Sequence, residues 1–434
     1  MPIVQPFLDP ANCGGLKGTS ITHYIIRLLH FIHSSVDNLK PHAVILALID
    51  LSKAFNRVDH LLVIQDLHDM KVPAWLLKIL ISYLTERSMV VKFRGATSSV
   101  RSLPGSSPQG VFLGCFFFKI KFNGALLRPN ISWPLPSPSP IMNTKATSCT
   151  VKYIDDASQA RSIDLRTALL HDHRDRPRPL QYRERTGHIL SPLHNQLQVD
   201  LNELKSFTDR NLMVINQKKT QIMSINFSRT LDFPPELTIG DSGFLDVVRH
   251  TKLVGIVVSD DLKWDRHVEY MCKRASRKIW QIRRMKILRL EPEILLDFYC
   301  KEVRSILEFG VACWNSGLTV KLVKQIERVQ KICVNLILCD TEWEIPYEIG
   351  CTLLGIEPLF LRRKELCIRF IQKTSTNPSH ADMFTRNPKN INTRQDNLLY
   401  REYSCRTNRF YNSPLCSLTR LLNMNPVKGC PKKG

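Results

Sequence analysis

The sequence predicts an α+β protein with an antiparallel sheet, followed by a largely helical region. The first observation is AVILALID (43–50), a continuous apolar run that ends in a carboxylate and is typical of a strand buried on both faces. The second is CTVKYIDDASQA (149–160), which has the pattern of a strand, a two-residue turn and a second strand. The third is the change near residue 266, after which long amphipathic helical patterns replace strand patterns.

Composition limits the class of protein before any motif is considered. The 434 residues are 43% hydrophobic and 23% charged, which excludes disordered, collagen-like and small disulfide-stapled chains. Lys and Arg number 61 against 39 Asp and Glu, and the net charge of +22 indicates an anionic partner, since folding does not require such an excess. Nucleic acid is the commonest such partner, and an anionic membrane surface is the alternative.

The sequence lacks membrane spans, a secretory signal and zinc-binding cysteine patterns. No apolar run reaches the length of about 18 residues that a membrane span needs, and no basic segment followed by an apolar one marks a secretory signal. The 13 cysteines include no CxxC pair and no Cys/His cluster with zinc spacing. We therefore expect an intracellular protein with reduced thiols and no membrane partner.

The first hundred residues alternate helical and strand patterns. Residues 19–36 begin with a Thr-Ser cap signal, after which apolar residues repeat at helical spacing, which predicts a helix. Helices are also expected over 59–70 and 73–86. The second would begin with Pro73, which is tolerated in the first turn of a helix. Residues 88–103 alternate and carry Gly and Ser, which predicts a hairpin.

The middle of the chain continues the mixture. Residues 105–123 read as a loop that enters an apolar helix, in which we expect the three consecutive phenylalanines at 116–118 to be core. Residues 128–140 contain five prolines and are expected to be a surface loop. A helix is expected over 194–208, and strands within 213–225 and 247–264.

The last part of the chain is helical and basic. Residues 268–288 have one apolar side and are rich in Lys and Arg elsewhere, so we expect contact with a nucleic-acid backbone rather than an ordinary solvated face. Residues 360–434 hold 15 Lys or Arg and 4 Asp or Glu, which is +11 of the total charge. We place a domain boundary near 264.

Two acidic sites interrupt the apolar background. Asp50 ends the first predicted strand, and Asp155 and Asp156 lie in the strand–turn–strand segment. Carboxylates at the ends of buried strands are costly unless they are paired, hydrogen-bonded or metal-bound, although Asp in a tight turn alone is common. Three such carboxylates in a strongly basic chain are suited to hold two Mg²⁺ ions about 3.5–4 Å apart for nucleotidyl transfer.

Three segments follow one another in a specific order: ALIDLSKAFNRVDH (47–60), PGSSPQGVFLG (104–114) and YIDD (153–156). They resemble polymerase motifs A, B and C of the reverse transcriptases of non-LTR (long-interspersed-type) retrotransposons. In motif A the resemblance implies Asp50 as a metal ligand, Leu51 as a backbone-carbonyl ligand and Phe55 as the aromatic residue that selects the sugar.

The resemblance extends over most of the chain. In motif C it implies that Asp155 is a principal metal ligand beside Asp50 and that Asp156 supports them. NQKKTQIM (216–223) resembles motif D, with Lys219 near the triphosphate. Two further sets are implied. In motif B, the residues beside template and nucleotide would be Ser107, Pro108, Gln109 and Gly110. In the primer grip, a hairpin within 252–264, they would be Leu253, Val254 and Gly255.

The family resemblance implies a right-hand polymerase with incomplete fingers. Residues 1–40 would be a remnant of the fingers and the palm entry, 41–264 the α+β palm, 265–359 the helical thumb and 360–434 a basic C-terminal extension. The implied activity is RNA-directed DNA synthesis with two Mg²⁺ ions, for which Mn²⁺ could substitute. The implied partners are an RNA template, a DNA primer and deoxynucleoside triphosphates, and the implied location is the nucleus, at the site of integration.

Departures from the family pattern leave alternatives open. Only 49 residues precede Asp50, so we expect the chain to be a portion of a longer element protein or a decayed copy. Lys17 stands where the family often has arginine, and Asn56 where it often has aspartate. The runner-up is a catalytically inactive nucleic-acid-binding remnant. An RNA-templated RNA polymerase is disfavoured by the bulky Phe55.

Overall fold

The structure is a computed structural model whose described residues fall into two compact units. The first unit comprises Met1–Tyr24 and Asn38–Val248, and the second comprises Ile25–Asp37 and Arg249–Gly434. The residues that the structure describes are 3–9, 11–15, 18–38, 42–103, 105–107, 112–125, 148–154, 156–164, 191–227, 237–240, 243–338, 345–387 and 398–426.

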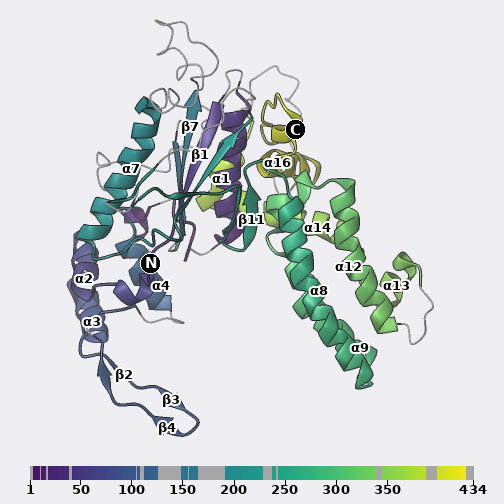
Figure 1. The fold of residues 1–434 in the computed structure, drawn as a ribbon, viewed down its shortest axis with the longest axis horizontal. Helices are drawn as coiled ribbons and strands as arrows, with labels where there is room; N and C mark the ends of the chain where they lie inside the picture. Colours follow the sequence, from purple (N-terminus) through teal and green to yellow (C-terminus); the bar gives the residue numbers. More distant parts are fainter. Residues whose placement is uncertain are drawn as a thin grey trace, which may run out of the picture. The chain divides into compact units, whose positions relative to one another are not determined.

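The first unit is organised around a five-stranded sheet (Figure 1). Its strand order is β6 (Ser148–Tyr153), β7 (Asp156–Asp164), β1 (His42–Ile49), β8 (Gln221–Asn226) and β9 (Asp246–Val247). The pairs β6–β7, β7–β1 and β1–β8 are antiparallel, and β8–β9 is parallel. The central position of β1 explains its uninterrupted apolar sequence, since both of its faces are covered.

One face of this sheet forms a core with four helices. Alternate residues of β1 belong to it, from Ala43 to Ile49, because successive side chains of a strand point to opposite faces. Phe117 and Phe118 lie in the same core, as the sequence predicts. The four helices are α2 (His60–Asp69), α3 (Ala74–Leu84), α4 (Phe112–Lys121) and α7 (Ser191–Arg210).

Local sequence sets the starts of these helices. The Asp59 carboxylate accepts a hydrogen bond from the Leu62 backbone N–H at 2.9 Å and so caps α2. Pro73 stands immediately before α3 with an extended backbone. Helix α7 is tied to β7 by a buried ion pair in which Arg161 donates to both carboxylate oxygens of Asp200, at 2.7 and 2.6 Å.

The remaining elements of the first unit are short. Two 3₁₀ turns, η1 (Gln5–Phe7) and η2 (Ala54–Arg57), precede and follow β1. Between α3 and α4 the chain forms an extended hairpin. Its paired segments are β2 (Ser88–Met89), β3 (Lys92–Phe93), β4 (Ala96–Thr97) and β5 (Arg101–Ser102).

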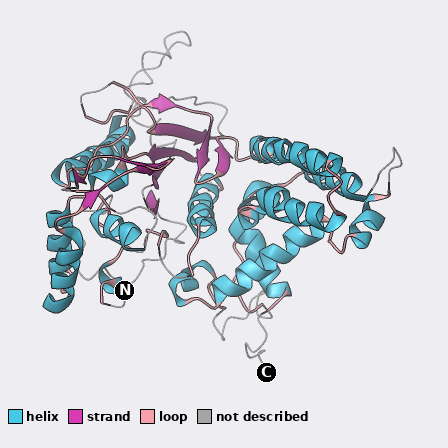
Figure 2. Cartoon of the chain, turned by 90° about the horizontal axis from the view of Figure 1, so that it is seen from below, coloured by secondary structure: helices cyan, strands magenta, loops and turns pink. Residues whose placement is uncertain are grey.

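In the part of the second unit that the structure describes, the elements are helical apart from one hairpin and the isolated bridge between Arg386 and Tyr400 (Figure 2). The hairpin joins β10 (His250–Leu253) to β11 (Ile256–Ser259) and precedes the long helix α8 (Asp265–Ile287). The following elements are α9 (Pro292–Phe298), η4 (Tyr299–Arg304), α10 (Ser305–Glu308), α11 (Val311–Trp314), η5 (Asn315–Gly317), α12 (Val320–Leu338), α13 (Tyr347–Leu353), α14 (Leu359–Ser375), η6 (Pro378–Met383), α15 (Asn408–Tyr411) and α16 (Pro414–Met424).

Helix α1 (Ile21–Val36) begins in the first unit and continues in the second. Within the second unit its residues are fastened to the basic C-terminal region. Arg27 Nη2 donates to Asp382 Oδ1 at 2.7 Å. The backbone N–H groups of Arg406 and Thr407 each donate to the Asp37 carboxylate at 2.8 Å. Residues 25–37 are therefore an integral part of the helical unit.

The predicted α+β class is confirmed, with an antiparallel sheet apart from its last pair. The strand expected within 213–225 occupies only the second half of that segment. Residues 213–220 are not strand apart from the isolated bridge between Leu51 and Ile215; they contain a turn at 217–219, and β8 begins at Gln221. Lys218 and Lys219 lie in that turn, where a polar pair is better solvated than in a central strand.

The described residues bear on the predictions about membrane spans and cysteines. None of the helices in the described ranges is long and apolar enough to cross a membrane. The eleven cysteines within those ranges are free thiols, eight of them buried. The predicted proline-rich loop at 128–140 lies outside the described residues.

Candidate functional site

Asp50 lies directly after the central strand β1, where the strand leaves the core. Its side chain is 34% exposed, in contrast to the buried residues before it. Ile49 pairs with Ala157 in the antiparallel register of β1 and β7, and β7 begins with Asp156. Asp50 and Asp156 each lie one residue beyond this pair, Asp50 after the end of β1 and Asp156 at the start of β7. Two acidic residues far apart in sequence therefore lie at the same end of two neighbouring strands.

The turn between β6 and β7 carries the remaining acidic residue of YIDD. Tyr153 pairs with Asp156, so the two strands are joined by two residues. Ile154 has φ +58°, the left-handed region that a β-branched residue adopts only when its surroundings impose it. Asp155 itself lies outside the described residues. Among the residues that are described, no three or more His, Cys, Asp or Glu side chains form a metal-binding group.

The turn that contains Lys219 is hydrogen-bonded to Asp50. The Asn216 N–H donates to the Asp50 carbonyl at 2.8 Å, and the Asp50 N–H donates to the Thr220 hydroxyl oxygen at 3.3 Å. Lys219 Nζ lies 4.0 Å from Asp50 Oδ2, and its side chain is 70% exposed. The structure thus brings together Asp50 and Lys219, which the sequence assigned to the same site.

The segment after Asp50 packs back into the core. Leu51 is buried. Because the leucine side chain has no oxygen, its backbone carbonyl is the one ligand oxygen that it offers. Phe55 is half-buried, and its ring centroid lies 5.1 Å from that of Phe118. The Phe55 carbonyl accepts a hydrogen bond from the Ser107 N–H at 2.7 Å. Phe55 is therefore held at the same time by the core and by the loop before α4.

That loop is fixed by its own polar groups. The Ser107 hydroxyl is buried and donates to the Gly114 carbonyl at 2.7 Å. The Ser106 N–H donates to the Val58 carbonyl at 3.0 Å, and His60 Nε2 donates to the Ser106 carbonyl at 2.8 Å. Ser107 thus supports the loop through an internal bond. The neighbouring predicted residues Pro108, Gln109 and Gly110 lie outside the described residues, as does Lys17.

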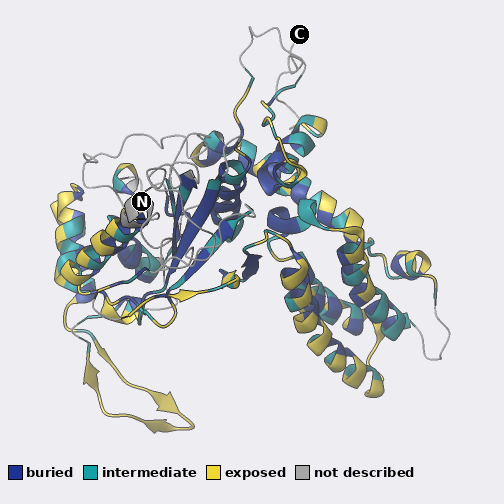
Figure 3. Ribbon diagram, turned by 45° about the horizontal axis from the view of Figure 1, so that its top comes forward, coloured by how far each residue is buried: buried dark blue, intermediate teal, exposed yellow. Residues whose placement is uncertain are grey.

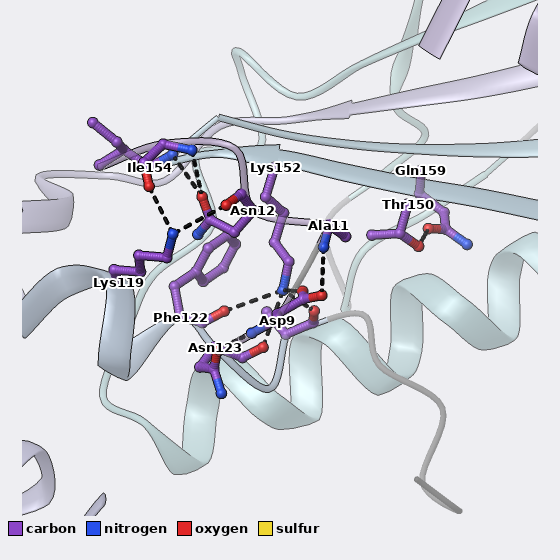
Figure 4. Close-up of polar contacts among 12 residues, drawn as sticks. Asp9, Ala11, Asn12, Lys119, Phe122, Asn123, Thr150, Lys152, Ile154 and Gln159 are labelled. Atoms are coloured by element: carbon purple, nitrogen blue, oxygen red, sulfur yellow. Dashed lines mark hydrogen bonds and ion pairs between the residues drawn. The ribbon is translucent and has the colours of Figure 1, made fainter. Parts of the chain in front are cut away.

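A buried lysine stands directly before the YIDD sequence. Lys152 is fully buried, and its Nζ lies 2.5 Å from Asp9 Oδ2 (Figure 4). It also donates hydrogen bonds to three backbone carbonyls at 2.7–3.3 Å, those of Phe122, Asn123 and Ala125. A buried charge needs this many partners because desolvation is otherwise too costly.

The N-terminal segment 9–14, here called the N-terminal clamp, holds the turn that follows Lys152. Asn12 Oδ1 accepts hydrogen bonds from the Ile154 N–H at 3.3 Å and the Gly14 N–H at 3.1 Å. Lys119, from α4, donates to the carbonyls of Asn12 and Gly14 at 3.0 and 2.8 Å (Figure 4). Burial lowers the pKa of Lys119 to about 8. The clamp therefore links helix α4 to the β6–β7 turn.

Sequence reasoning missed these clamp residues. Asp9 and Asn12 precede every recognisable pattern, and their partners lie more than a hundred residues away. A usable signal was present in FFFKIKF (116–122), where single lysines stand among aromatic residues at core density. A lysine in such a position is rarely buried without a carboxylate or carbonyl partner.

The predicted primer-grip residues lie in the β10–β11 hairpin of the second unit. Leu253 is buried, and the two turn residues Val254 and Gly255 have φ +45° and +97°. A Cβ on Gly255 would lie 2.8 Å from the Phe309 ring, so only glycine fits this position. The hairpin continues onto α8, where the Val257 N–H donates to His267 Nδ1 at 3.3 Å and burial lowers the pKa of His267 to about 4.

Helix α8 has the two faces that the sequence predicts (Figure 3). Val268, Met271, Ala275 and Ile279 are among its buried residues. Trp280 is 63% exposed, and the Arg284 guanidinium lies 5.8 Å from the centroid of its ring. The exposed cations of the helix are Arg266, Lys273, Arg274, Arg277, Arg283 and Arg284.

Comparisons with known proteins add little to this geometry. No protein-family model matches the chain, and no curated protein matches it. Among solved structures, the chain is similar to telomerase from Candida albicans in complex with a fragment of telomeric RNA, at 11% identity and a TM-score of 0.32. The match covers 88% of this chain and 53% of that one, so the chain spans about half the length of the telomerase. The function of this chain is therefore inferred from its own residues and not from this similarity.

Proposed function

We propose that the chain is the reverse-transcriptase portion of a non-LTR retrotransposon protein, an RNA-directed DNA polymerase. One observation carries the proposal: Asp50 follows the central strand, lies one residue beyond the Ile49–Ala157 pair as Asp156 does, and has Lys219 Nζ 4.0 Å from its carboxylate. The motif order along the sequence supports it, since these three residues come from the segments that resemble motifs A, C and D.

The acidic edge suits a pair of Mg²⁺ ions, with Mn²⁺ as a substitute. The Asp50 carboxylate is partly exposed at the strand end, Asp156 starts the neighbouring strand at the same end, and both provide the hard oxygen ligands that Mg²⁺ prefers. Asp155 and the Leu51 carbonyl would complete the ligand set. The ions would supply Lewis-acid activation of the primer hydroxyl and neutralisation of the leaving pyrophosphate.

The remaining residues would position the substrates. Lys219 would offset the charge of a triphosphate held near Asp50, because its exposed side chain can reach beyond the carboxylate. Phe55 would exclude a ribose 2′-hydroxyl by steric contact, since its ring is fixed against Phe118. The loop Ser107–Gly110 would lie beside the template and the incoming deoxynucleotide.

The domain assignment belongs to the same proposal. Residues 41–264 would be the palm, 265–359 the thumb and 360–434 a basic extension, with 1–40 belonging to the fingers. Leu253, Val254 and Gly255 would contact the DNA primer, and the exposed cations of α8 would contact the backbone of the RNA–DNA duplex. If active, the protein would work in the nucleus, at the site of integration.

The test compares nucleic-acid binding with catalysis. We expect the 434-residue chain to bind RNA with an affinity that falls steeply with salt, because its charge is +22. We expect weak extension, since Lys17 and Lys219 are the motif-matched cations in these residues and positioning accounts for about 7–11 kcal/mol of such a barrier. The measurements are a filter-binding salt titration and primer extension with Mg²⁺ and deoxynucleotides.

Variants decide between the active enzyme and an inactive remnant. Asp50→Asn and Asp155→Asn should abolish extension by the chain or by a longer element protein and leave RNA binding intact. Phe55→Val should admit ribonucleotides with little loss of deoxynucleotide use. Extension that survives both Asp variants would overturn the assignment, and extension absent from every form would leave the binding remnant as the function.

A further inference from the structure

A hairpin projects from the first unit between α3 and α4, and we call its residues 88–102 the arm (Figure 1). Ser88 pairs with Ser102 at its base, and Phe93 pairs with Ala96 near its tip. All fifteen residues of the arm are exposed, in contrast to the strands of the sheet (Figure 3). The arm is therefore a surface element that contributes nothing to the core of its unit.

The arm exposes an unusual amount of apolar surface. Phe93 and Val100 are 69% and 68% exposed, and Met89 and Val91 are at least half exposed. A two-stranded hairpin is marginally stable by itself in water. A contiguous exposed apolar surface commonly marks an interaction site. These side chains indicate that the arm functions with a bound partner.

The charge of the arm indicates an anionic partner. Lys92, Arg94 and Arg101 lie on it, and the sequence contains no Asp or Glu between Glu86 and Asp155. At the tip, the Arg94 guanidinium lies 5.3 Å from the centroid of the Phe93 ring. A cation beside an exposed aromatic ring is the combination with which proteins contact a phosphate and stack on the adjoining base.

The strand pairing of the arm argues against addition of a further protein strand. Met89 pairs with Arg101 and Lys92 with Thr97, so the return strand has one more residue than the outgoing strand. This bulge twists the ribbon and interrupts the row of backbone groups that another strand would use. Side-chain contacts are thus the available mode of binding.

We propose that the arm binds single-stranded nucleic acid, with Lys92, Arg94 and Arg101 on the phosphates and Phe93 stacked on a base. The proposal rests on the proposed polymerase function only in that the strand would then be the template. Binding by the arm requires no catalysis and no metal ion.

The first experiment measures fluorescence anisotropy of a labelled 20-nucleotide oligo(dT) with the full chain. The arm variant is Lys92→Gln/Arg94→Gln/Arg101→Gln. The matched control, Lys71→Gln/Lys78→Gln/Lys321→Gln, removes the same charge from exposed positions outside the arm. We expect the arm variant to bind at least tenfold more weakly than the control, and its salt slope to be smaller by about 2, from about 0.7 for each lost phosphate contact.

The second experiment tests stacking. Phe93→Ala should weaken oligo(dT) binding about tenfold, within the range for loss of one stacked base, whereas Phe93→Tyr should bind like the parent. Binding of both arm variants equal to the control would overturn the proposal. So would a loss confined to a 20-base-pair duplex, or sedimentation showing a dimer that Phe93→Ala dissociates, since the arm would then bind duplex or a second copy.

A last comparison separates this proposal from the polymerase assignment. Asp50→Asn should bind oligo(dT) like the parent chain, because Asp50 is remote from the arm in sequence and its side chain is not one of the positive charges that contact phosphates. If extension is absent from all forms and the arm variants still lose binding, the polymerase assignment fails and the arm proposal stands. If Asp50→Asn abolishes extension and the arm variants bind normally, the reverse holds.

Discussion

Two hairpins of the first unit close through two-residue connections, yet their surroundings are opposite. In the β6–β7 hairpin, Ile154 has φ +58°, and in the arm Arg94 has φ +47°. The Ile154 N–H is held by Asn12, and the residue packs against the core. Arg94 and its neighbour Gly95 stand in open solvent, and a Cβ on Gly95 would meet nothing within 4 Å. The same local geometry thus serves one fixed element and one free element.

The β6–β7 turn is held by its neighbours and the tip of the arm is exposed to solvent, and these two surroundings suit different functions. A group that must hold a reacting atom needs neighbours that fix it, and the clamp provides one through Asn12, whose carbonyl is in turn held by Lys119 of α4. A surface that follows a flexible strand has no such need, and the arm keeps its contacts within itself. The comparison therefore predicts large losses of stability from changes in the clamp and small ones from changes in the arm.

The largest effect is expected from Lys152→Met. The substitution leaves the Asp9 carboxylate buried without its cation, and loss of one partner of a buried ion pair costs about 3–5 kcal/mol. The free energy of unfolding from urea denaturation, followed by far-UV circular dichroism, measures it. Lys152→Met/Asp9→Asn should recover at least half of the loss, because neither charge of the pair remains. A loss below about 1 kcal/mol would show that Asp9 is neutralised elsewhere.

The next effect depends on pH and involves Lys119. Its pKa is lowered from 10.5 to about 8 in the folded chain, so between these values the unfolded chain binds more protons. The contribution of this lysine to the free energy of unfolding therefore rises with pH from 8 to 10.5, by up to roughly 3 kcal/mol. The difference between parent and Lys119→Met should change by that amount over this range.

A control removes the other titrations from that measurement. Tyrosines such as Tyr24, whose pKa is raised by burial, contribute equally to the parent and to Lys119→Met. Lys78→Met, at an exposed position of α3, is the control for replacing a lysine by methionine. A pH-independent difference between the parent and Lys119→Met would contradict the lowered pKa.

Much of the fold could be predicted because its elements have strong periods. The central strand, the β6–β7 hairpin and helices α1, α2, α3, α4, α7 and α8 all follow from apolar spacing and caps. The first half of 213–225 could not, because Met213 and Ile215 are buried by tertiary contacts of a turn and imitate a strand. The spacing of apolar residues reports which residues are buried, and burial alone does not distinguish a buried turn from a strand.

The candidate site was predictable only in part, for a different reason. Asp50 was visible from the residues alone as a carboxylate after an apolar strand, whereas Lys219 came from the family resemblance. The clamp residues were not visible, since Asp9 and Asn12 act through side chains and backbone groups more than a hundred residues away. No local pattern encodes contacts at that separation.

A smaller effect is expected from Asn12→Ala. The substitution removes the acceptor of the Ile154 and Gly14 N–H groups, and a buried donor left without a partner costs about 1–3 kcal/mol. We expect a loss of about 2 kcal/mol in the free energy of unfolding and faster hydrogen exchange at Ile154. Asn56→Ala, at an exposed position, is the control. Unchanged exchange at Ile154 would mean that the clamp does not hold the turn.

The smallest effect is expected in the arm itself, from Phe93→Ala. The ring is 69% exposed, and a surface substitution of this kind changes the free energy of unfolding by less than about 0.5 kcal/mol. Urea denaturation should therefore superimpose on that of the parent, even though nucleic-acid binding is weakened. A loss above about 1 kcal/mol would show that Phe93 packs against the rest of the chain in solution. The arm would then be a structural element like the β6–β7 hairpin, and the contrast between the two hairpins would fail.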